Sequence, residues 1–274
     1  MAPEISNIIL SELYSPGAGR PRYLDGERQI NPKNTQEVVR ILREALEWPT
    51  TILAEQLERC GVVYTPPELV IADENTFSPE GASPTEEGPF YCPVDNTIYI
   101  DPNFFKDQLL KLESDHDIWA ITIAYVILHE IGHHIQMTLG QQIGIIPEDF
   151  DDFLNQNPIL EDEPNLFLIA MELQADCISG MLMNVESQRR KNTLEQGDRN
   201  EVEEDAADIG DDVIMIHSHI PPMAEYMTHG TAKMRRDALK LGLTLTDVSQ
   251  VPGLQHFINI AREVYDKYHI LSVQ

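Results

Sequence analysis

Hydrophobic residues recur along this chain with two different periods, and the longer one predicts a mostly helical protein. From Asn34, with Glu37 three residues later as in a capping box, the spacing predicts an amphipathic helix that breaks near Pro49. Its core-facing positions are Val38, Ile41, Leu42 and Leu46. A second helix is expected over residues 50–60.

The period changes to that of strands between Val62 and Asp101. Apolar and β-branched residues at 69–72 and at 97–100 predict two short strands, and the loop between them is rich in Pro, Gly and Glu. The sequence therefore predicts a small sheet between helical segments.

Two strongly apolar segments predict buried helices. The first contains residues 118–128, with Asp115 or Asp117 as a start signal and Gly140 as a stop. The second covers residues 164–185 and begins with a proline, which the first turn of a helix accepts. The longest uninterrupted apolar stretch, 118–128, is far shorter than the ~20 residues of a bilayer span, so we predict no membrane span.

The C-terminal third is also expected to be helical. Asp198 can cap a helix that ends before Pro221 and presents one apolar face to the core. That face consists of Val202, Ala206, Ile209, Val213 and Ile216. The acidic segment 141–163 is interpreted as a solvated loop or short surface helix, with a position beside a cleft as the alternative.

These elements predict a predominantly helical α+β fold in which a small β-sheet lies beside the helix containing residues 118–128. Residues 15–21 (SPGAGRP) have the chemistry of a loop. We therefore expect residues 1–33 to form an extended N-terminal arm and residues 34–274 to form a single domain.

The composition narrows the choice of partners. With 46 acidic and 19 basic residues, the net charge is −27, which disfavours nucleic acids and anionic membrane surfaces. Three cysteines, at positions 60, 92 and 177, cannot form a closed disulfide framework. Residues 1–10 lack the basic start of a secretory signal, so we expect a cytoplasmic protein.

The clearest chemical signal is the H-E-x-x-H sequence from His129 to His133. Residues four apart share one face of a helix, so both histidines can bind one metal ion while Glu130 projects toward a metal-activated water. Gly132 leaves room for another backbone to approach. This pattern indicates a zinc hydrolase.

A zinc site of this kind needs a third protein ligand and one open position. Glu172 is the best candidate, and Asp176 follows one turn later, where it can hold a ligating histidine by its other ring nitrogen. Carboxylates on a mostly apolar face require partners, and zinc is one. Ordinary salt bridges or exposure to solvent are the alternatives.

Several segments together resemble the neutral zinc metallopeptidase family. They are residues 88–101 (GPFYCPVDNTIYID), 129–134, 172–180 (ELQADCISG), 206–212 (AADIGDD) and 228–235 (THGTAKMR). The resemblance implies a zincin-like domain with one Zn²⁺ on His129, His133 and Glu172 and with Glu130 as the base. It also implies a peptide or unfolded-protein substrate, whose backbone pairs with a sheet edge above the metal.

The chain departs from the family pattern in three respects. Members usually carry Cys-Gly where this sequence has Glu80-Gly81, so Cys92 lacks its disulfide partner. Met234 stands where a glutamine usually precedes the arginine at position 235. Members also often begin with a membrane-spanning segment, and we expect none here.

Four residues near Pro221 are candidates to donate to the oxyanion of the reaction, namely His217, His219, Tyr226 and His229. A structural or surface role is the alternative for each of them. We prefer His229, because it lies in the THG block that resembles the family.

The hypothesis is a zinc-dependent metallopeptidase in which a zinc-activated water attacks the peptide carbonyl and Glu130 is the general base. Asp176 would orient His129 or His133, and His229 would steady the oxyanion. Two alternatives stay open: a catalytically silent binding or regulatory module stapled by zinc, and a zinc hydrolase of a non-peptide amide.

Overall fold

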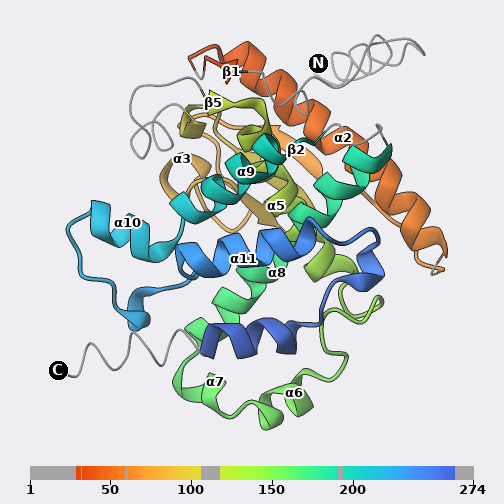
Figure 1. Cartoon of the computed structure of the whole chain (residues 1–274), viewed down its shortest axis with the longest axis vertical. Coiled ribbons are helices and arrows are strands. Elements are labelled where there is room, and N and C mark those ends of the chain that lie inside the picture. Colours follow the sequence, from red (N-terminus) through yellow and green to blue (C-terminus); the bar gives the residue numbers. More distant parts are fainter. Residues whose placement is uncertain (1–28, 32, 60, 106–117, 190–193, 263–274) are drawn as a thin grey trace.

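The computed structural model describes residues 29–31, 33–59, 61–105, 118–189 and 194–262. It is a predominantly helical α+β protein with a small sheet, as predicted (Figure 1). Most of the expected arm 1–33 lies outside the described residues, as do the start signals Asp115 and Asp117. Within the arm, β1 (Gln29–Ile30) pairs antiparallel with β5 (Ile118–Trp119).

The first helix is longer than predicted, because α2 (Thr35–Arg59) continues through Pro49. The predicted break is wrong. A proline inside a helix removes one backbone hydrogen bond, here the one to the carbonyl of Ala45, but Pro49 is buried with the apolar face of the helix. Packing of a continuous apolar face outweighs the local cost.

The sheet has one strand more than predicted. β2 (Glu68–Ile71) runs parallel to β4 (Thr97–Ile100), and β3 (Phe90–Cys92) pairs antiparallel with the other side of β4. A short helix, α3 (Pro84–Glu87), precedes β3. In the order β2-β4-β3, β3 is an edge strand of this sheet.

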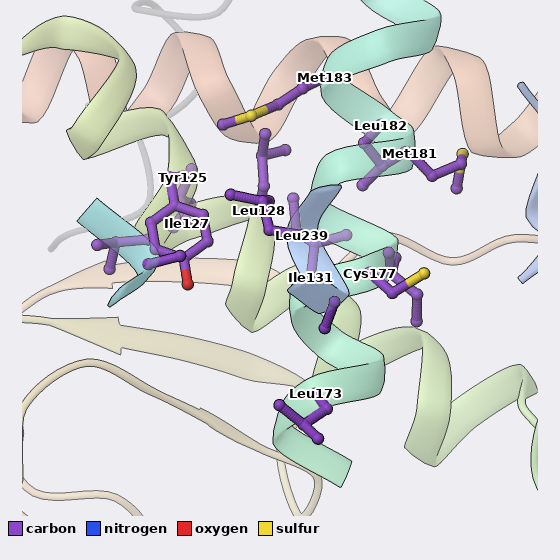
Figure 2. Close-up of a cluster of buried hydrophobic side chains, with 14 of the residues drawn as sticks. Tyr125, Ile127, Leu128, Ile131, Leu173, Cys177, Met181, Leu182, Met183 and Leu239 are labelled. Atoms are coloured by element: carbon purple, nitrogen blue, oxygen red, sulfur yellow. The ribbon is translucent and has the colours of Figure 1, made fainter. Parts of the chain in front are cut away.

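Three helices form the centre of the molecule. α8 (Asn165–Arg189) packs against α5 (Ala120–Leu139) and against α11 (Ala232–Gly242), and Figure 2 shows the apolar side chains that these helices contribute to the core. Gly140 follows the last residue of α5, as predicted. The helix over residues 164–185 is also confirmed, with its end at Arg189.

Glycines let these helices approach one another closely. A Cβ on Gly132 would lie 2.8 Å from the Cα of Ala175, so the expected approach of another backbone is confirmed and involves α8. A Cβ on Gly242 would lie 2.0 Å from the carbonyl oxygen of Cys177. Both distances are too short for any side chain, so α5, α8 and α11 meet backbone to backbone.

The C-terminal third contains two helices where one was predicted. α9 (Gln196–Asp208) ends before Gly210, where α10 (Asp211–His217) begins, and Ile216 is 59% exposed, not in the core. The chain turns at Gly210, which packs closely against the backbone of Ala232. A Cβ on Gly210 would lie 2.2 Å from the backbone nitrogen of Ala232. The N-cap of α9 is Glu195, and Asp198 is the N3 residue of the capping box. The 3-10 helices Ala224–Tyr226 and Val248–Gln250 flank α11 in sequence, and a final helical segment begins at residue 254.

The acidic segment 141–163 contains two short helices, α6 (Phe150–Gln156) and α7 (Ile159–Asp162). They lie at the bottom of Figure 1. The expectation of a solvated loop or short surface helix is therefore close to the structure.

One helix, α8, is long and apolar enough to cross a membrane by length and composition alone. Of its most apolar window, 78% is buried inside the protein, which is also the pattern of a core helix. Polar residues, among them Glu172, Gln174 and Asp176, interrupt the apolar sequence of α8. The described residues contain no clear membrane span.

Candidate metal centre

Three side chains from two helices converge on one point. On α5, Nε2 of His129 lies 3.1 Å from Nε2 of His133, and on α8 Glu172 places its two oxygens 3.1 Å and 3.2 Å from these nitrogens. Donor atoms around a tetrahedral zinc ion with bonds of ~2.0–2.1 Å are separated by about 3.3 Å. The three residues can therefore hold a metal ion, and two histidines with one glutamate are a known ligand set for catalytic zinc.

The protons of His133 are fixed by a chain of glutamines. Gln174 donates to the carbonyl oxygens of Ile145 and Pro252 at 3.0 Å and 2.9 Å, so its own oxygen must accept from Gln136, at 3.0 Å. The amide of Gln136 is thereby oriented with its oxygen 2.9 Å from Nδ1 of His133. That nitrogen must carry the proton, because only it can donate to an acceptor.

Asp176 determines the protons of His129 in the same way. Its Oδ1 lies 2.8 Å from Nδ1 of His129 and accepts from the hydroxyl of Tyr125 at 2.7 Å. In a ring that carries no second proton, Nε2 thus holds the lone pair, and in both histidines this atom faces the carboxylate of Glu172. Two lone pairs and a carboxylate so close together require a cation between them, either a proton or a metal ion.

Arg235 of α11 completes this network and is buried. Its Nε and Nη2 each donate to Asp176 at 2.9 Å, one to each carboxylate oxygen. Its Nη2 also lies 3.9 Å from Oε2 of Glu172. A bidentate pair of this kind fixes the plane of Asp176 and, through it, the ring of His129.

The electrostatics of the cluster favour positive charge. Burial opposes protonation of His129, but Asp176 and Glu172 outweigh it and raise the pKa of the imidazole to about 10. Burial raises the pKa of Glu172, but the adjacent His133 and His129 outweigh burial and hold this pKa well below its usual value. A cation at this point is therefore stabilised by both carboxylates.

Glu130 lies beside the three ligands and is 5% exposed. Burial raises the pKa of its carboxyl, and the nearby His133 and His129 lower it in part. The backbone of Tyr91, on edge strand β3, also lowers this pKa slightly. Glu130 therefore lies between the two histidines and the edge of the sheet.

A cleft of 410 Å³ opens over the cluster, and five of the six predicted site residues line it. They are His129, Glu130, His133, Glu172 and His229. The cleft lining contains none of the other oxyanion candidates, His217, His219 and Tyr226. It also contains no residue of the acidic segment 141–163.

His229 is positioned by Asp211, the first residue of α10. One oxygen of Asp211 accepts from the backbone N–H groups of Thr228, His229 and Gly230 at 2.7–2.9 Å, and the other lies 3.2 Å from Nδ1 of His229. The hydrogen bond with Asp211 raises the pKa of His229, and this effect outweighs burial, which lowers the pKa. Nε2 is left free to act in the cleft.

The neighbouring His134 has a different role, although it belongs to the same turn of α5. Its ring packs edge-on against Tyr64 and Tyr91, with centroids 5.5 Å and 5.2 Å away. Burial lowers the pKa of His134 to about 4, so the ring is neutral. It supports β3 against α5.

Sequence reasoning missed the residues that hold the predicted ones. They are Tyr125, Gln136, Gln174, Asp211 and Arg235. Spacing contained a partial signal, since Tyr125 precedes His129 by one turn of the helix and Gln136 follows His133 by three residues. Arg235 lies in the THG block, but the sequence does not indicate that Asp176 is its partner.

Comparison with known proteins agrees with this geometry. The family described as "Putative neutral zinc metallopeptidase" matches residues 13–253. The chain belongs to this family. The family description supports zinc as the metal and a metallopeptidase as the class of protein, and the zincin-like fold expected from the sequence fits it.

Proteins similar to this chain include an Escherichia coli (strain K12) protein, "Uncharacterized protein YpfJ". It is 35% identical over 81% of this chain and 73% of its own length. A Mycobacterium bovis protein, "Uncharacterized protein Mb2605", is 29% identical over 67% of this chain and 61% of its own length. No solved structure matches the chain.

Proposed function

We propose that this protein is a zinc-dependent metallopeptidase that binds one Zn²⁺ per chain and hydrolyses peptide bonds, with Glu130 as the general base. The observation that carries the proposal is the convergence of two imidazole lone pairs and a carboxylate beside a buried glutamate in an open cleft. A purely structural zinc site is usually closed by four protein ligands and needs no base.

His129, His133 and Glu172 would hold the metal. When bound there, Zn²⁺ polarises the carbonyl of the substrate and lowers the pKa of water. The remaining steps belong to the chain itself.

Glu130 moves the proton. Its carboxylate accepts a proton from the attacking water as the water oxygen bonds to the carbonyl carbon, and returns it to the leaving nitrogen as the C–N bond breaks. Burial raises the pKa of Glu130, so its carboxylate accepts a proton more readily than one in water. Glu130 lines the cleft, where the substrate would bind.

His229 would steady the negative charge that develops on the carbonyl oxygen. Asp211 holds the ring by Nδ1, at 3.2 Å, and thereby presents Nε2 as a donor when the ring is protonated. Asp176, itself held by Arg235, orients His129.

Edge strand β3 favours a peptide over another amide. Phe90 and Tyr91 of this strand line the cleft, and one side of β3 is unpaired in the described sheet. An extended peptide can pair with this edge by strand addition, whereas a small amide cannot.

The alternatives are weaker on the same observations. A silent module stapled by zinc explains neither the base nor the open cleft. A hydrolase of a non-peptide amide shares the metal site but leaves the free edge of β3 without a role.

The test is release of peptides from an unfolded protein by the zinc-loaded chain, beside Glu130→Gln and an exposed control, Glu161→Gln. We expect activity in the wild type and the control, and its loss in Glu130→Gln with zinc content unchanged. Loss of zinc in Glu130→Gln would contradict the assignment of this residue as base. Equal activity in all three proteins would contradict the site itself.

We also propose a cytoplasmic location. Cys92 and Cys177 are free buried thiols, which persist in a reducing compartment. Fractionation of cells that express the full chain would test this, and recovery with membranes or outside the cytoplasm would contradict it.

A further inference from the structure

We propose that the cleft contains an apolar subsite that selects a large apolar side chain of the substrate next to the bond that is cut. The subsite is defined by five residues from separate parts of the chain: Phe90, Phe104, Val126, Ile209 and Ile214. The proposal rests on the proposed peptidase function and names the substrate class for that same site.

The subsite begins one helical turn from the base. Val126 precedes Glu130 by four residues on α5, so both side chains lie on one face, about 6 Å apart along the helix axis. Both residues line the cleft. A side chain that neighbours the reacting carbonyl of an extended peptide therefore falls within reach of Val126.

Phe104 forms the adjoining wall and is held firmly. Its ring packs edge-on against the fully buried Phe105, with centroids 5.4 Å apart. Gly88, with φ of 90°, keeps the space beside this ring open, because a Cβ there would lie 3.6 Å from it. A residue with a side chain at position 88 would be strained and would narrow the subsite.

Ile214 closes the opposite side from α10 and is 42% exposed. An isoleucine so exposed contributes little to the core, but a bound apolar side chain would cover it. α10 is fixed in place by Asp211, whose backbone N–H and carboxylate both bind residues 228–230. Ile214 is therefore presented on a rigid element.

The charges in the cleft support an apolar occupant. The carboxylates that line it are Glu87, Glu130 and Glu172, of which the last two belong to the metal centre. Glu87 is turned in part toward its own helix, where it accepts from the backbone N–H of Ser83 at 3.2 Å. The wall made by Val126, Ile209 and Ile214 consists of uncharged, apolar side chains.

Two isoleucines of α10 provide a matched test. Ile214 lines the cleft, whereas Ile216 is 59% exposed on the same helix and does not. We would compare Ile214→Asp with Ile216→Asp on fluorogenic peptides that differ only in a Leu, Lys or Asp beside the scissile bond. Thermal unfolding of both variants provides the control for folding.

We expect the wild type to prefer the Leu peptide, and Ile214→Asp to lower kcat/KM for that peptide about tenfold or more, within the range that side-chain fit supplies. Ile216→Asp should match the wild type. Equal effects of the two substitutions, or a wild-type preference for the Lys peptide, would overturn the subsite.

A binding measurement separates this inference from the peptidase proposal. Fluorescence anisotropy of the same labelled peptides with zinc-loaded Glu130→Gln reports selection without turnover. If no peptide is cut by the wild type but the Leu peptide binds best and binding is weakened by Ile214→Asp, the subsite stands and the peptidase proposal fails. If peptides are cut with no preference at this position, the subsite fails alone.

Discussion

Gln136 places its side-chain oxygen 2.9 Å from Nδ1 of His133, on the side of the ring that faces away from the metal centre. The contact leaves His133 with only one tautomer, because Gln136 is itself oriented by Gln174. In the neutral ring, the lone pair therefore lies on the ligand atom Nε2, which faces Glu172 and the metal centre.

Gln136→Leu should reduce zinc affinity by ~10–100-fold, as the loss of partners behind a ligating histidine commonly does. The buried oxygen of Gln174 would also lose its donor. Competition with a zinc-binding dye measures the affinity, and Gln142→Leu, at an exposed glutamine, is the control. Unchanged affinity in Gln136→Leu would show that the tautomer of His133 is set by other means.

Arg235→Met should destabilise the fold by ~3–5 kcal/mol, because the buried Asp176 would lose its bidentate cation and keep only His129 and the Tyr125 hydroxyl as partners. Arg235→Lys should lose less, since the charge remains while the bidentate geometry is lost. Urea unfolding of the metal-free chain measures both. Arg236→Met, at an exposed neighbour, should have little effect, and an equal loss there would contradict the special role of the buried pair.

Gly132→Ala should destabilise the protein by ~1–3 kcal/mol, although alanine is the better helix former by ~1 kcal/mol. The added methyl group would meet the backbone of Ala175 and force α5 away from α8. Since the ligands come from both helices, zinc affinity should fall together with stability. Thermal unfolding with and without zinc checks both effects; a stabilised variant would mean that the two helices can separate without cost.

Glu80→Cys should form a disulfide with Cys92 under oxidising conditions. The carboxylate of Glu80 lies 3.9 Å from Sγ of Cys92, at the position where relatives are expected to carry a cysteine. Closing so short a loop should stabilise the fold by about 3 kcal/mol. Thiol counting by mass spectrometry detects the bond, with the double variant Glu80→Cys/Cys92→Ser as control. Persistent free thiols in the single variant would show that the backbone keeps the two positions apart.

Removal of the metal should lower the melting temperature, because a ligand that binds only the folded state stabilises it by about 1.4 kcal/mol per tenfold excess over Kd. Added zinc should restore the melting temperature in the wild type. In Glu172→Gln the dependence on zinc should largely disappear. A response equal to that of the wild type would place the third ligand elsewhere.

The sequence was sufficient to predict that His129 and His133 lie together, because helical spacing brings them to one face whatever surrounds them. It also indicated that Glu172 and Asp176 have close partners, since two carboxylates on an apolar helix need them. The distance of 2.8 Å between Asp176 and His129 agrees with that interpretation. These inferences depend only on the geometry of a single helix or on the rule that a buried carboxylate needs a partner.

What the sequence did not reveal depends on contacts between distant segments. Pro49 predicts a break, but tertiary packing carries α2 through it. The break at Gly210 arises from contact with Ala232, which nothing nearby in the sequence indicates. Likewise, β3 is only three residues long, and Arg235 finds its partner 59 positions earlier in the chain.

The hydrogen bonds of Asp211 connect two parts of the cleft, α10 and the loop that contains His229. The same carboxylate that begins α10 holds the loop of His229, so the proposed donor and the proposed wall at Ile214 are displaced together or not at all. Recognition of the substrate side chain and stabilisation of the reacting oxygen are then coupled. A substrate that fits the wall poorly would be cut slowly as well as bound weakly.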